Sequence, residues 1–446
     1  MRWYLCFVLL LGSTPAPALA QQCRLVIHSA SAPSTSLPST NSQSLNSPST
    51  TSVSTSAAPT PTQTPFVPFA YGSTPVRGVN LGGWFVLEPW ITPSIFNNTN
   101  NNAIIDEYTF GQLQDDQTAL GVLQQHWDTW ITENDFIAIA AAGLTHVRIP
   151  VGYWSVPTNT SVSPYIPGAW PYLQRAVGWA RSHGLHTIID LHGAPGSQNG
   201  YDNSGQRTNS PQWALNSTNV NATLAVIQVL ASELGPNVDA IELLNEVAGF
   251  LGSAWDSAVR QYWQSGYAVV RQAADDNVVV VIGDAFEGVE HEYQIFSTLE
   301  LSRSEDEHIQ FACQDTLPTL AGFAPNNMWT VTGEWSTATT DCATWLNGRG
   351  VGARWDGSIG GGTTALGSCE GLTGDWTTFS NDYIAYLRKY WEVQVEVGEA
   401  VQGWIYWTWK TESADEWSYQ KGLEGGWIPK DPTQRLYPGL CNGTSS

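Results

Sequence analysis

Short apolar runs alternate with amphipathic stretches along the chain from about Phe66 onward. Runs rich in Val, Ile and Leu without polar alternation are typical of parallel strands that are covered on both faces. Seven such strands are predicted, at Val76–Leu81, Thr145–Val151, His186–Leu191, Asp239–Leu244, Val278–Gly283, Trp329–Gly333 and Gln402–Trp407. Helices are predicted between them, at Asn134–Ala142, Trp170–His183, Val220–Leu234 and Asp256–Ala274. This α/β alternation, with an eighth strand expected at Val289–Gln294, favours a (β/α)8 TIM barrel over a doubly wound sheet.

The first 65 residues lack this alternation and divide into two segments. Residues 1–20 contain Arg2, an apolar run at Leu5–Leu11 and the small-residue sequence Ala18-Leu19-Ala20, a combination typical of a secretory signal peptide. Residues 21–65 are rich in Ser, Thr and Pro, which supply 26 of the 37 residues of Ser29–Pro65, and none of these 37 is charged. Such a segment cannot bury enough apolar surface to fold. We therefore expect a disordered, O-glycosylated linker, followed by the barrel at residues 66–446.

Charge and composition narrow the possible partners. The chain has 18 Lys and Arg against 40 Asp and Glu, a net charge of −22, which argues against binding to nucleic acid or to anionic lipid. After the first segment no apolar run reaches the 18 residues of a membrane span, and Asn442–Ser446 lacks the hydrophobic tail of a lipid anchor signal. Trp is unusually frequent, with 22 residues, and its flat apolar face suits stacking on sugar rings. We expect a secreted monomer whose Asn-x-Ser/Thr sequons are compatible with glycosylation.

The cysteines are predicted to form disulfides. Loss of residues 1–20 removes Cys6 and leaves five, of which Cys23 precedes the linker. The other four lie in the predicted barrel, at Cys313, Cys342, Cys369 and Cys441. In an oxidising compartment they are expected to form two disulfides, for which spacing alone allows three pairings. Their spacing has no metal-binding pattern, so no metal is predicted.

Polar residues lie in or directly after several of the predicted strands, near the C-terminal strand ends where the active site of a (β/α)8 barrel is built. They are Glu88 after the first strand, Arg148 in the second, Asp190 and His192 at the end of the third, Asn245 and Glu246 after the fourth, and Glu334 after the seventh. The last strand adds Trp404, Trp407 and Trp409. Two carboxyl groups on nearly opposite strands are what glycoside hydrolysis requires, because one protonates the leaving oxygen while the other attacks the sugar or positions water.

Seven motifs resemble those of fungal exo-β-1,3-glucanases, a branch of the retaining glycoside hydrolase family 5. They are Arg77–Trp90, Val147–Gly152, Asp190–Gly200, Asp202–Gly205, Leu244–Glu246, Gly333–Ser336 and Trp407–Glu412. The resemblance extends from about Arg77 to Cys441 and leaves the linker outside. It implies hydrolysis of a β-glucan polysaccharide substrate, with release of glucose from non-reducing ends, in cell-wall metabolism. It implies no cofactor.

The resemblance also assigns roles to individual residues. Glu246 would be the general acid/base and Glu334 the nucleophile, which Arg148 would keep ionised. Asn245 would hydrogen-bond the sugar 2-hydroxyl, and Glu88 would bind hydroxyls of the terminal glucose. The remaining substrate-binding positions are His192, His291 and Tyr293 in the same subsite and Trp407 at its floor. Asp202 belongs to the motif Asp202–Gly205, and Tyr201 and Phe296 would lie at the mouth of the site. The implied disulfides are Cys342–Cys369 and Cys313–Cys441, which leaves Cys23 free or intermolecular.

Two departures from the family pattern stand out. Val247 replaces the Pro that usually follows the acid/base, and about twenty family residues are missing between the fifth strand and His291. Only Ala285–Gly288 separate the end of the fifth strand near Asp284 from the expected sixth strand. Four extended residues span at most about 14 Å, too little for the crossover that parallel strands need. We therefore expect a defective or shortened fifth crossover and a short or displaced sixth strand.

Two alternatives to this function stay open from the sequence. The same fold could act on another β-glucoside, such as β-1,6-glucan or a small glucoside. The chain could instead be an inactive glucan-binding relative, because the missing segment weakens the barrel wall.

The missing segment generates a prediction about the gene. A coding segment omitted from the sequence explains the gap better than a naturally shortened enzyme does, since the residues on both sides keep the family pattern. Sequencing of the transcript is expected to find about twenty additional codons between Phe286 and His291. An unaltered transcript whose product hydrolyses laminarin normally would contradict the claim that the gap damages the barrel.

Overall fold

The computed structural model describes residues 5–10, 67–274, 276–288, 301–326 and 328–442. The linker at residues 21–65 lies outside these ranges, as do His291, Tyr293 and Phe296 and the sixth strand expected at Val289–Gln294. Within the described residues, no helix combines the length and the apolar character that crossing a lipid bilayer requires.

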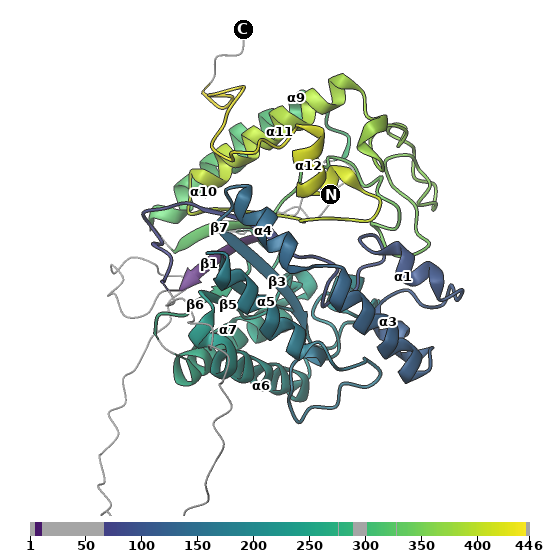
Figure 1. Cartoon of the computed structure of the whole chain (residues 1–446), viewed down its shortest axis with the longest axis vertical. Coiled ribbons are helices and arrows are strands. Elements are labelled where there is room, and N and C mark those ends of the chain that lie inside the picture. Colours follow the sequence, from purple (N-terminus) through teal and green to yellow (C-terminus); the bar gives the residue numbers. More distant parts are fainter. Residues whose placement is uncertain (1–4, 11–66, 275, 289–300, 327, 443–446) are drawn as a thin grey trace, which may run out of the picture.

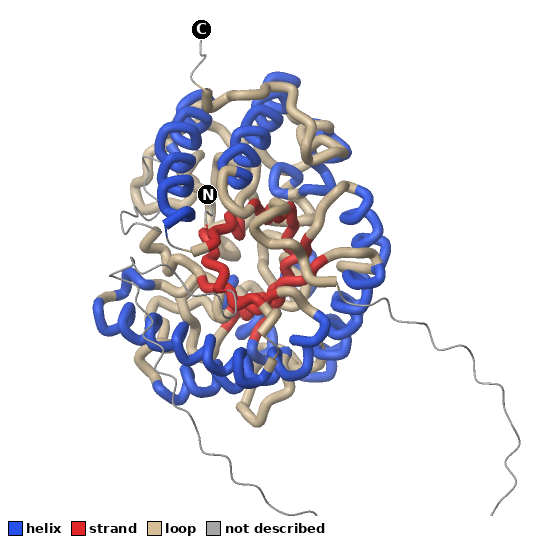
Figure 2. The backbone as a smooth tube through the Cα atoms, turned by 90° about the vertical axis from the view of Figure 1, so that its left-hand side faces the viewer, coloured by secondary structure: helices blue, strands red, loops and turns tan. Residues whose placement is uncertain are grey.

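Eight strands form a closed ring that is surrounded by helices (Figure 2). The strands are β1 (Leu5–Leu10), β2 (Val76–Asn80), β3 (His146–Gly152), β4 (His186–Gly193), β5 (Ala240–Glu242), β6 (Val279–Ile282), β7 (Trp329–Glu334) and β8 (Gly403–Tyr406). Their order around the ring is β1-β6-β5-β4-β3-β2-β8-β7. All pairings among β2 to β8 are parallel. The seven strands predicted from the apolar runs are thus confirmed, and the fold is a (β/α)8-type barrel.

The helices cover the outside of this ring (Figures 1 and 2). The four predicted helices are confirmed as α4 (Glu133–Ala141), α5 (Trp170–Ser182), α6 (Ser217–Leu234) and α7 (Ser253–Ala273). The others are α1 (Pro93–Asn98), α2 (Glu107–Gln112), α3 (Asp116–Thr129), α9 (Glu305–Phe311), α10 (Leu317–Phe323), α11 (Asn381–Glu399) and α12 (Tyr419–Gly425). Side-chain caps start several of them, such as Asn216 on α6 and Ser380 on α11, because their oxygens accept from otherwise unpaired backbone N–H groups.

The interior of the barrel is layered from apolar to polar. One buried cluster is purely apolar and comprises Val76, Ile188, Ala240, Val279, Val281, Val331 and Ile405. Asp190 and Glu242 follow Ile188 and Ala240 by two residues in their strands, so their side chains share the same inner face. These two acidic residues are also direct partners in the parallel ladder between β4 and β5. The strand register therefore places a layer of charged groups directly above an apolar floor.

The sixth position of the barrel has an unexpected occupant. β1 lies between β6 and β7 and pairs antiparallel with both, with Val8 opposite Ile282 and Leu9 opposite Trp329. Described residues 283–288 contain no helix, and Leu301, the first residue described after them, is helical. A segment that the sequence assigns to an export signal thus occupies this position, and the expected strand Val289–Gln294 lies outside the described residues. Paired edges satisfy backbone groups that would otherwise be exposed, and an incoming antiparallel strand fits without a crossover.

Both predicted disulfides are confirmed. Cys313 bonds to Cys441 across 128 residues, and Cys342 bonds to Cys369 across 27. The first attaches the C-terminal segment to the π-helical segment Ala312–Thr316 that joins α9 to α10, and the second closes the long connection that follows β7. Closing loops of this length contributes about 2–4 kcal/mol each, mainly by restricting the unfolded chain.

The position of β1 generates a prediction about processing. A chain that begins at Gln21 lacks this strand, so β6 and β7 face each other with unpaired edges. We expect its thermal unfolding midpoint to fall by roughly 5 °C or more relative to the full chain, since about 1 kcal/mol already moves the midpoint by several degrees. Calorimetry on both chains measures the difference. A synthetic peptide that contains Leu5–Leu10 should restore part of the loss, whereas equal midpoints would show that the barrel does not depend on this strand.

Candidate active site

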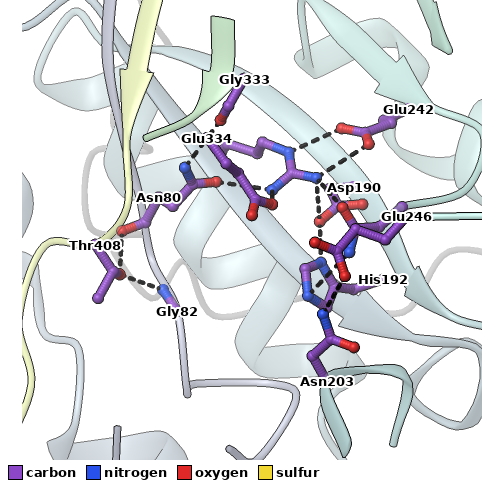
Figure 3. Close-up of polar contacts among 12 residues, drawn as sticks. Asn80, Gly82, Asp190, His192, Asn203, Glu242, Glu246, Gly333, Glu334 and Thr408 are labelled. Atoms are coloured by element: carbon purple, nitrogen blue, oxygen red, sulfur yellow. Dashed lines mark hydrogen bonds and ion pairs between the residues drawn. The ribbon is translucent and has the colours of Figure 1, made fainter. Parts of the chain in front are cut away.

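The centre of the site is the buried guanidinium of Arg148 on β3. Its Nε and Nη2 atoms donate to the two carboxylate oxygens of Glu242, at 2.8 and 3.0 Å. Its Nη1 atom donates to Glu334 at 2.5 Å and to Asn80 at 2.9 Å. Nη2 also donates to Asn245 at 2.9 Å and lies 3.0 Å from Asp190 Oδ2. One cation therefore connects side chains from β2, β4, β5 and β7, of which Figure 3 labels Asn80, Asp190, Glu242 and Glu334.

The two glutamates predicted to carry the chemistry differ in their environments. Glu334 ends β7 and contacts Arg148, while Glu246 lies in the turn after β5 and accepts from Asn203 at 2.5 Å and Asn199 at 3.3 Å. In Figure 3 both carboxyl groups project into the same space from different strands. The backbone of Glu246 has a positive φ of 46°, which is uncommon outside glycine and is typical of functional turns.

The pKa values of the two carboxyl groups follow from these environments. Burial raises the pKa of Glu246 well above its ordinary value, and the nearby charge of Glu334 raises it further. Burial also raises the pKa of Glu334, but the positive charge of Arg148 opposes this effect and limits the pKa to about 7. Of the two, Glu246 is therefore the group that holds a proton more readily, and Glu334 is the group that ionises first.

His192 is held at the wall of the site by three neighbours. Its Nδ1 lies 2.6 Å from Asp190 Oδ2, and its Nε2 faces the Nδ2 donor of Asn245 at 3.3 Å. Because the amide nitrogen can only donate, Nε2 accepts and Nδ1 carries the hydrogen. Burial lowers the pKa of His192 to about 3, so the ring is neutral. It stacks on Trp407 with 5.6 Å between ring centroids, which confirms that these two predicted residues lie together.

Glu88, Asp202 and Tyr201 lie on the side of the site near Glu246. Burial and the charge of Asp202 raise the pKa of Glu88 well above its ordinary value, and burial raises that of Asp202 to about 6. The charge of Glu246 contributes to a raised pKa of Tyr201, which places the phenol near that carboxylate. The structure thus brings these three predicted residues together with the two glutamates, whereas the predicted His291, Tyr293 and Phe296 lie outside the described residues.

Several buried carboxylate oxygens have no hydrogen-bond donor among the described residues. They are Glu88 Oε1, Asp190 Oδ1, Asp202 Oδ2 and Glu246 Oε1. A buried acceptor without a donor is unfavourable by about 1–3 kcal/mol, and such atoms are typical of ligand-binding sites. A molecule rich in hydroxyl groups supplies the missing donors. The aromatic ring of Trp407 beside them supplies an apolar surface for the C–H face of a sugar.

Five residues of the site were not identified from the sequence. They are Asn80, Asn199, Asn203, Glu242 and Phe286, of which Phe286 contacts Tyr201 with a centroid separation of 6.4 Å. A signal existed for two of them. Glu242 and Asn80 interrupt strands that are otherwise strongly apolar, and a polar side chain facing a barrel interior requires a partner. Asn199 and Phe286 lie in loops and Asn203 lies in a single 3-10 turn, Asp202–Ser204, where no periodic pattern marks them.

This arrangement can carry out acid-assisted displacement at a sugar carbon. A proton donor and an ionisable nucleophile face one space, and the two have different pKa values for physical reasons. No group of three or more His, Cys, Asp or Glu side chains in the described ranges is placed to hold a metal ion.

Comparison with known proteins agrees with this chemistry. The family model for cellulase (glycosyl hydrolase family 5) matches residues 112–342. The chain is 42% identical to a glucan 1,3-beta-glucosidase of Blumeria graminis, over 84% of this chain and 92% of that protein. It is also 42% identical to a probable glucan 1,3-beta-glucosidase A of Aspergillus niger, with the same coverage of both chains.

A solved structure shares the fold. The rutinosidase of Aspergillus niger aligns with 81% of this chain and 100% of its own length, with a TM-score of 0.57 and 18% sequence identity. Identity this low supports only the barrel architecture. The family match and the two relatives establish more, because they include the strand ends that carry the buried carboxylates. The chain is a glycoside hydrolase and belongs to glycosyl hydrolase family 5.

Proposed function

We propose that this protein is a secreted, retaining exo-β-1,3-glucanase that releases glucose from the non-reducing ends of β-1,3-glucan in the cell wall. The observation that carries the proposal is the pair Glu246 and Glu334, which face one space and of which Glu246 holds a proton more readily. The names of relatives that are 42% identical support the substrate class. The apolar run and cleavage-site sequence in residues 1–20 support secretion.

The proposed reaction has two steps. In the first, the Glu334 carboxylate attacks the anomeric carbon while Glu246 protonates the glycosidic oxygen, which leaves a glucosyl ester on Glu334. In the second, Glu246 removes a proton from water, the water attacks the same carbon, and Glu334 leaves as a carboxylate. Esterification removes the negative charge that raises the pKa of Glu246, so this pKa falls between the steps and the same group can act as acid and then as base.

Substrate recognition is assigned to the buried oxygens that lack donors. Glu88 accepts from Trp90 through one oxygen at 3.0 Å, which leaves Oε1 for a sugar hydroxyl. Asp202 Oδ2 offers a second acceptor. Trp407, stacked on His192, provides the apolar surface under the ring. Asn245, fixed by Arg148, is assigned to the 2-hydroxyl. Buried acceptors of this kind select a polyol and disfavour a ligand that lacks hydroxyl groups.

The competing function is an inactive glucan-binding relative, which the missing family segment favours. Product analysis on laminarin oligosaccharides separates it from the proposal. We expect the substrate to shorten by one glucose at a time, with β-glucose as the first product, and slower release from pustulan, a β-1,6-glucan. Release of laminaribiose or longer products would contradict exo action. Binding to insoluble β-1,3-glucan without sugar release would support the inactive relative.

The roles of the two glutamates are tested by matched amide variants. Glu246→Gln is expected to lower kcat/KM on laminarin oligosaccharides by about 10²–10⁴-fold, the usual contribution of general acid–base catalysis. Its effect should be much smaller on a dinitrophenyl β-glucoside, whose leaving group needs no proton. Azide should rescue turnover and yield β-glucosyl azide, and an α-configured product would contradict retention. Glu334→Gln should abolish covalent labelling by a 2-fluoro-glucoside, as followed by mass spectrometry.

A further inference from the structure

Glu242 is the one carboxylate of the cluster around Arg148 that has no place in the reaction proposed above. It lies on β5, fully buried inside the barrel, four residues before Glu246. Both of its oxygens are engaged by Arg148, at 2.8 Å from Nε and 3.0 Å from Nη2. In Figure 3 Glu242 lies across the cluster from Glu334. A sugar that contacts Glu246 and Glu334 therefore does not need Glu242 as a binding group.

The geometry of the pair has a directional consequence. A guanidinium is planar, and its five N–H bonds point in fixed directions. A carboxylate that accepts in parallel from Nε and Nη2 fixes the plane and its rotation. The orientation of the opposite edge of the guanidinium is thereby fixed as well. From that edge Nη1 donates to Glu334 Oε1 at 2.5 Å and to Asn80 at 2.9 Å. The second hydrogen of Nη2 reaches Asn245 at 2.9 Å.

We propose that Glu242 is a positioning residue, which fixes the Arg148 guanidinium so that one edge orients the nucleophile Glu334 and another orients Asn245. This inference rests on the proposed function. Asn80 supports the same orientation from β2, because its Nδ2 donates to the carbonyl oxygens of Gly333 and Tyr406 at 3.2 and 3.1 Å. The amide is therefore fixed with its oxygen toward Arg148. Glu242 acts at the opposite edge, through Nε and Nη2 of Arg148.

Glu242 also influences the nucleophile through its charge. The groups that face Glu334 from the surrounding elements are Arg148 on β3, Asp190 and His192 on β4, Glu242 on β5, Glu246 in the turn after β5, and Glu88 after β2. Arg148 is the only cation among these groups. The negative charge of Glu242 raises the pKa of Glu334, so removal of that charge should make the nucleophile more acidic.

Two substitutions separate orientation from charge. Glu242→Gln removes the charge and places an NH₂ donor against an Arg N–H donor, so the bidentate pair cannot form. We expect kcat to fall at least 10-fold with little change in KM, and the acid limb of the pH profile to move to lower pH. A dinitrophenyl β-glucoside is the substrate, because its hydrolysis does not require the proton of Glu246. Glu242→Asp keeps the charge, so its acid limb should stay close to that of the wild type while kcat falls because of the shorter side chain.

A matched control comes from another buried glutamate. Glu416 is equally buried and accepts from Thr373 at 2.6 Å and from the Gly374 N–H at 3.3 Å, and no described contact joins it to Arg148. Glu416→Gln therefore removes a buried carboxylate without touching the cluster, and its acid limb should match that of the wild type. Labelling by a 2-fluoro-glucoside corrects kcat for the fraction of folded enzyme in each variant.

Crystal structures of the Gln and Asp variants give a readout that does not depend on activity. In Glu242→Gln, Arg148 Nη1 should move away from Glu334 Oε1, whereas Glu416→Gln should leave this contact intact. An unmoved guanidinium together with an unshifted acid limb would overturn the positioning role.

If the wild type hydrolyses no glucoside, the proposed function fails, and the position of Arg148 still decides whether Glu242 orients it. If Glu242→Gln does not fold, Glu242→Asp must still lower kcat after correction for folded enzyme, and an unchanged kcat would refute the proposal.

Discussion

The inside of this barrel depends on a single buried cation. Arg148 contacts side chains of β2, β4, β5 and β7, and it faces three carboxyl groups, those of Asp190, Glu242 and Glu334. Charges are buried only at a high desolvation cost, so each of these groups requires the others. Removal of one partner from such a pair typically destabilises a protein by about 3–5 kcal/mol. The ion cluster therefore fixes how four strands meet, and the same contacts that order the strand ends also place the reacting groups.

The strand that bears Glu334 is also the strand beside the barrel's irregular wall. β7 pairs in parallel with β8 on one side and antiparallel with β1 on the other, where Leu5 is opposite Glu334. A (β/α)8 barrel holds its strand ends in place through closure of the sheet. Whatever occupies the sixth position thus acts directly on the strand that bears Glu334. Export with cleavage after Ala20 would remove the occupant seen here, so such processing would reach the strand end that carries Glu334.

The strands, which follow a repeating apolar pattern, could be predicted from the sequence, whereas individual contacts between distant segments could not. Val279–Ile282 and Trp329–Glu334 were found as strands because both faces of a parallel strand are covered, which leaves an apolar run. Glu246 and Glu334 were found because they end such runs. β1 was not, since pairing between Leu5–Leu10 and β6 is a long-range contact that leaves no periodic trace. Asn203, in the 3-10 turn Asp202–Ser204, was missed as a partner of Glu246 for the same reason.

The difference between the two carboxyl groups that we propose to be catalytic comes from where the cation is, because both groups are buried. Glu334 receives a hydrogen bond directly from Arg148, whereas Glu246 receives its hydrogen bonds from the neutral amides of Asn203 and Asn199. A neutral donor stabilises a carboxylate less than a charged donor does, so burial dominates at Glu246 and is partly offset at Glu334. Glu242 then limits how much of the Arg148 charge the nucleophile receives, because it engages the opposite edge of the same guanidinium. Burial raises the pKa of Glu334, and competition among carboxyl groups for one cation decides how far Arg148 offsets that effect, so a change at any of these groups reaches the others.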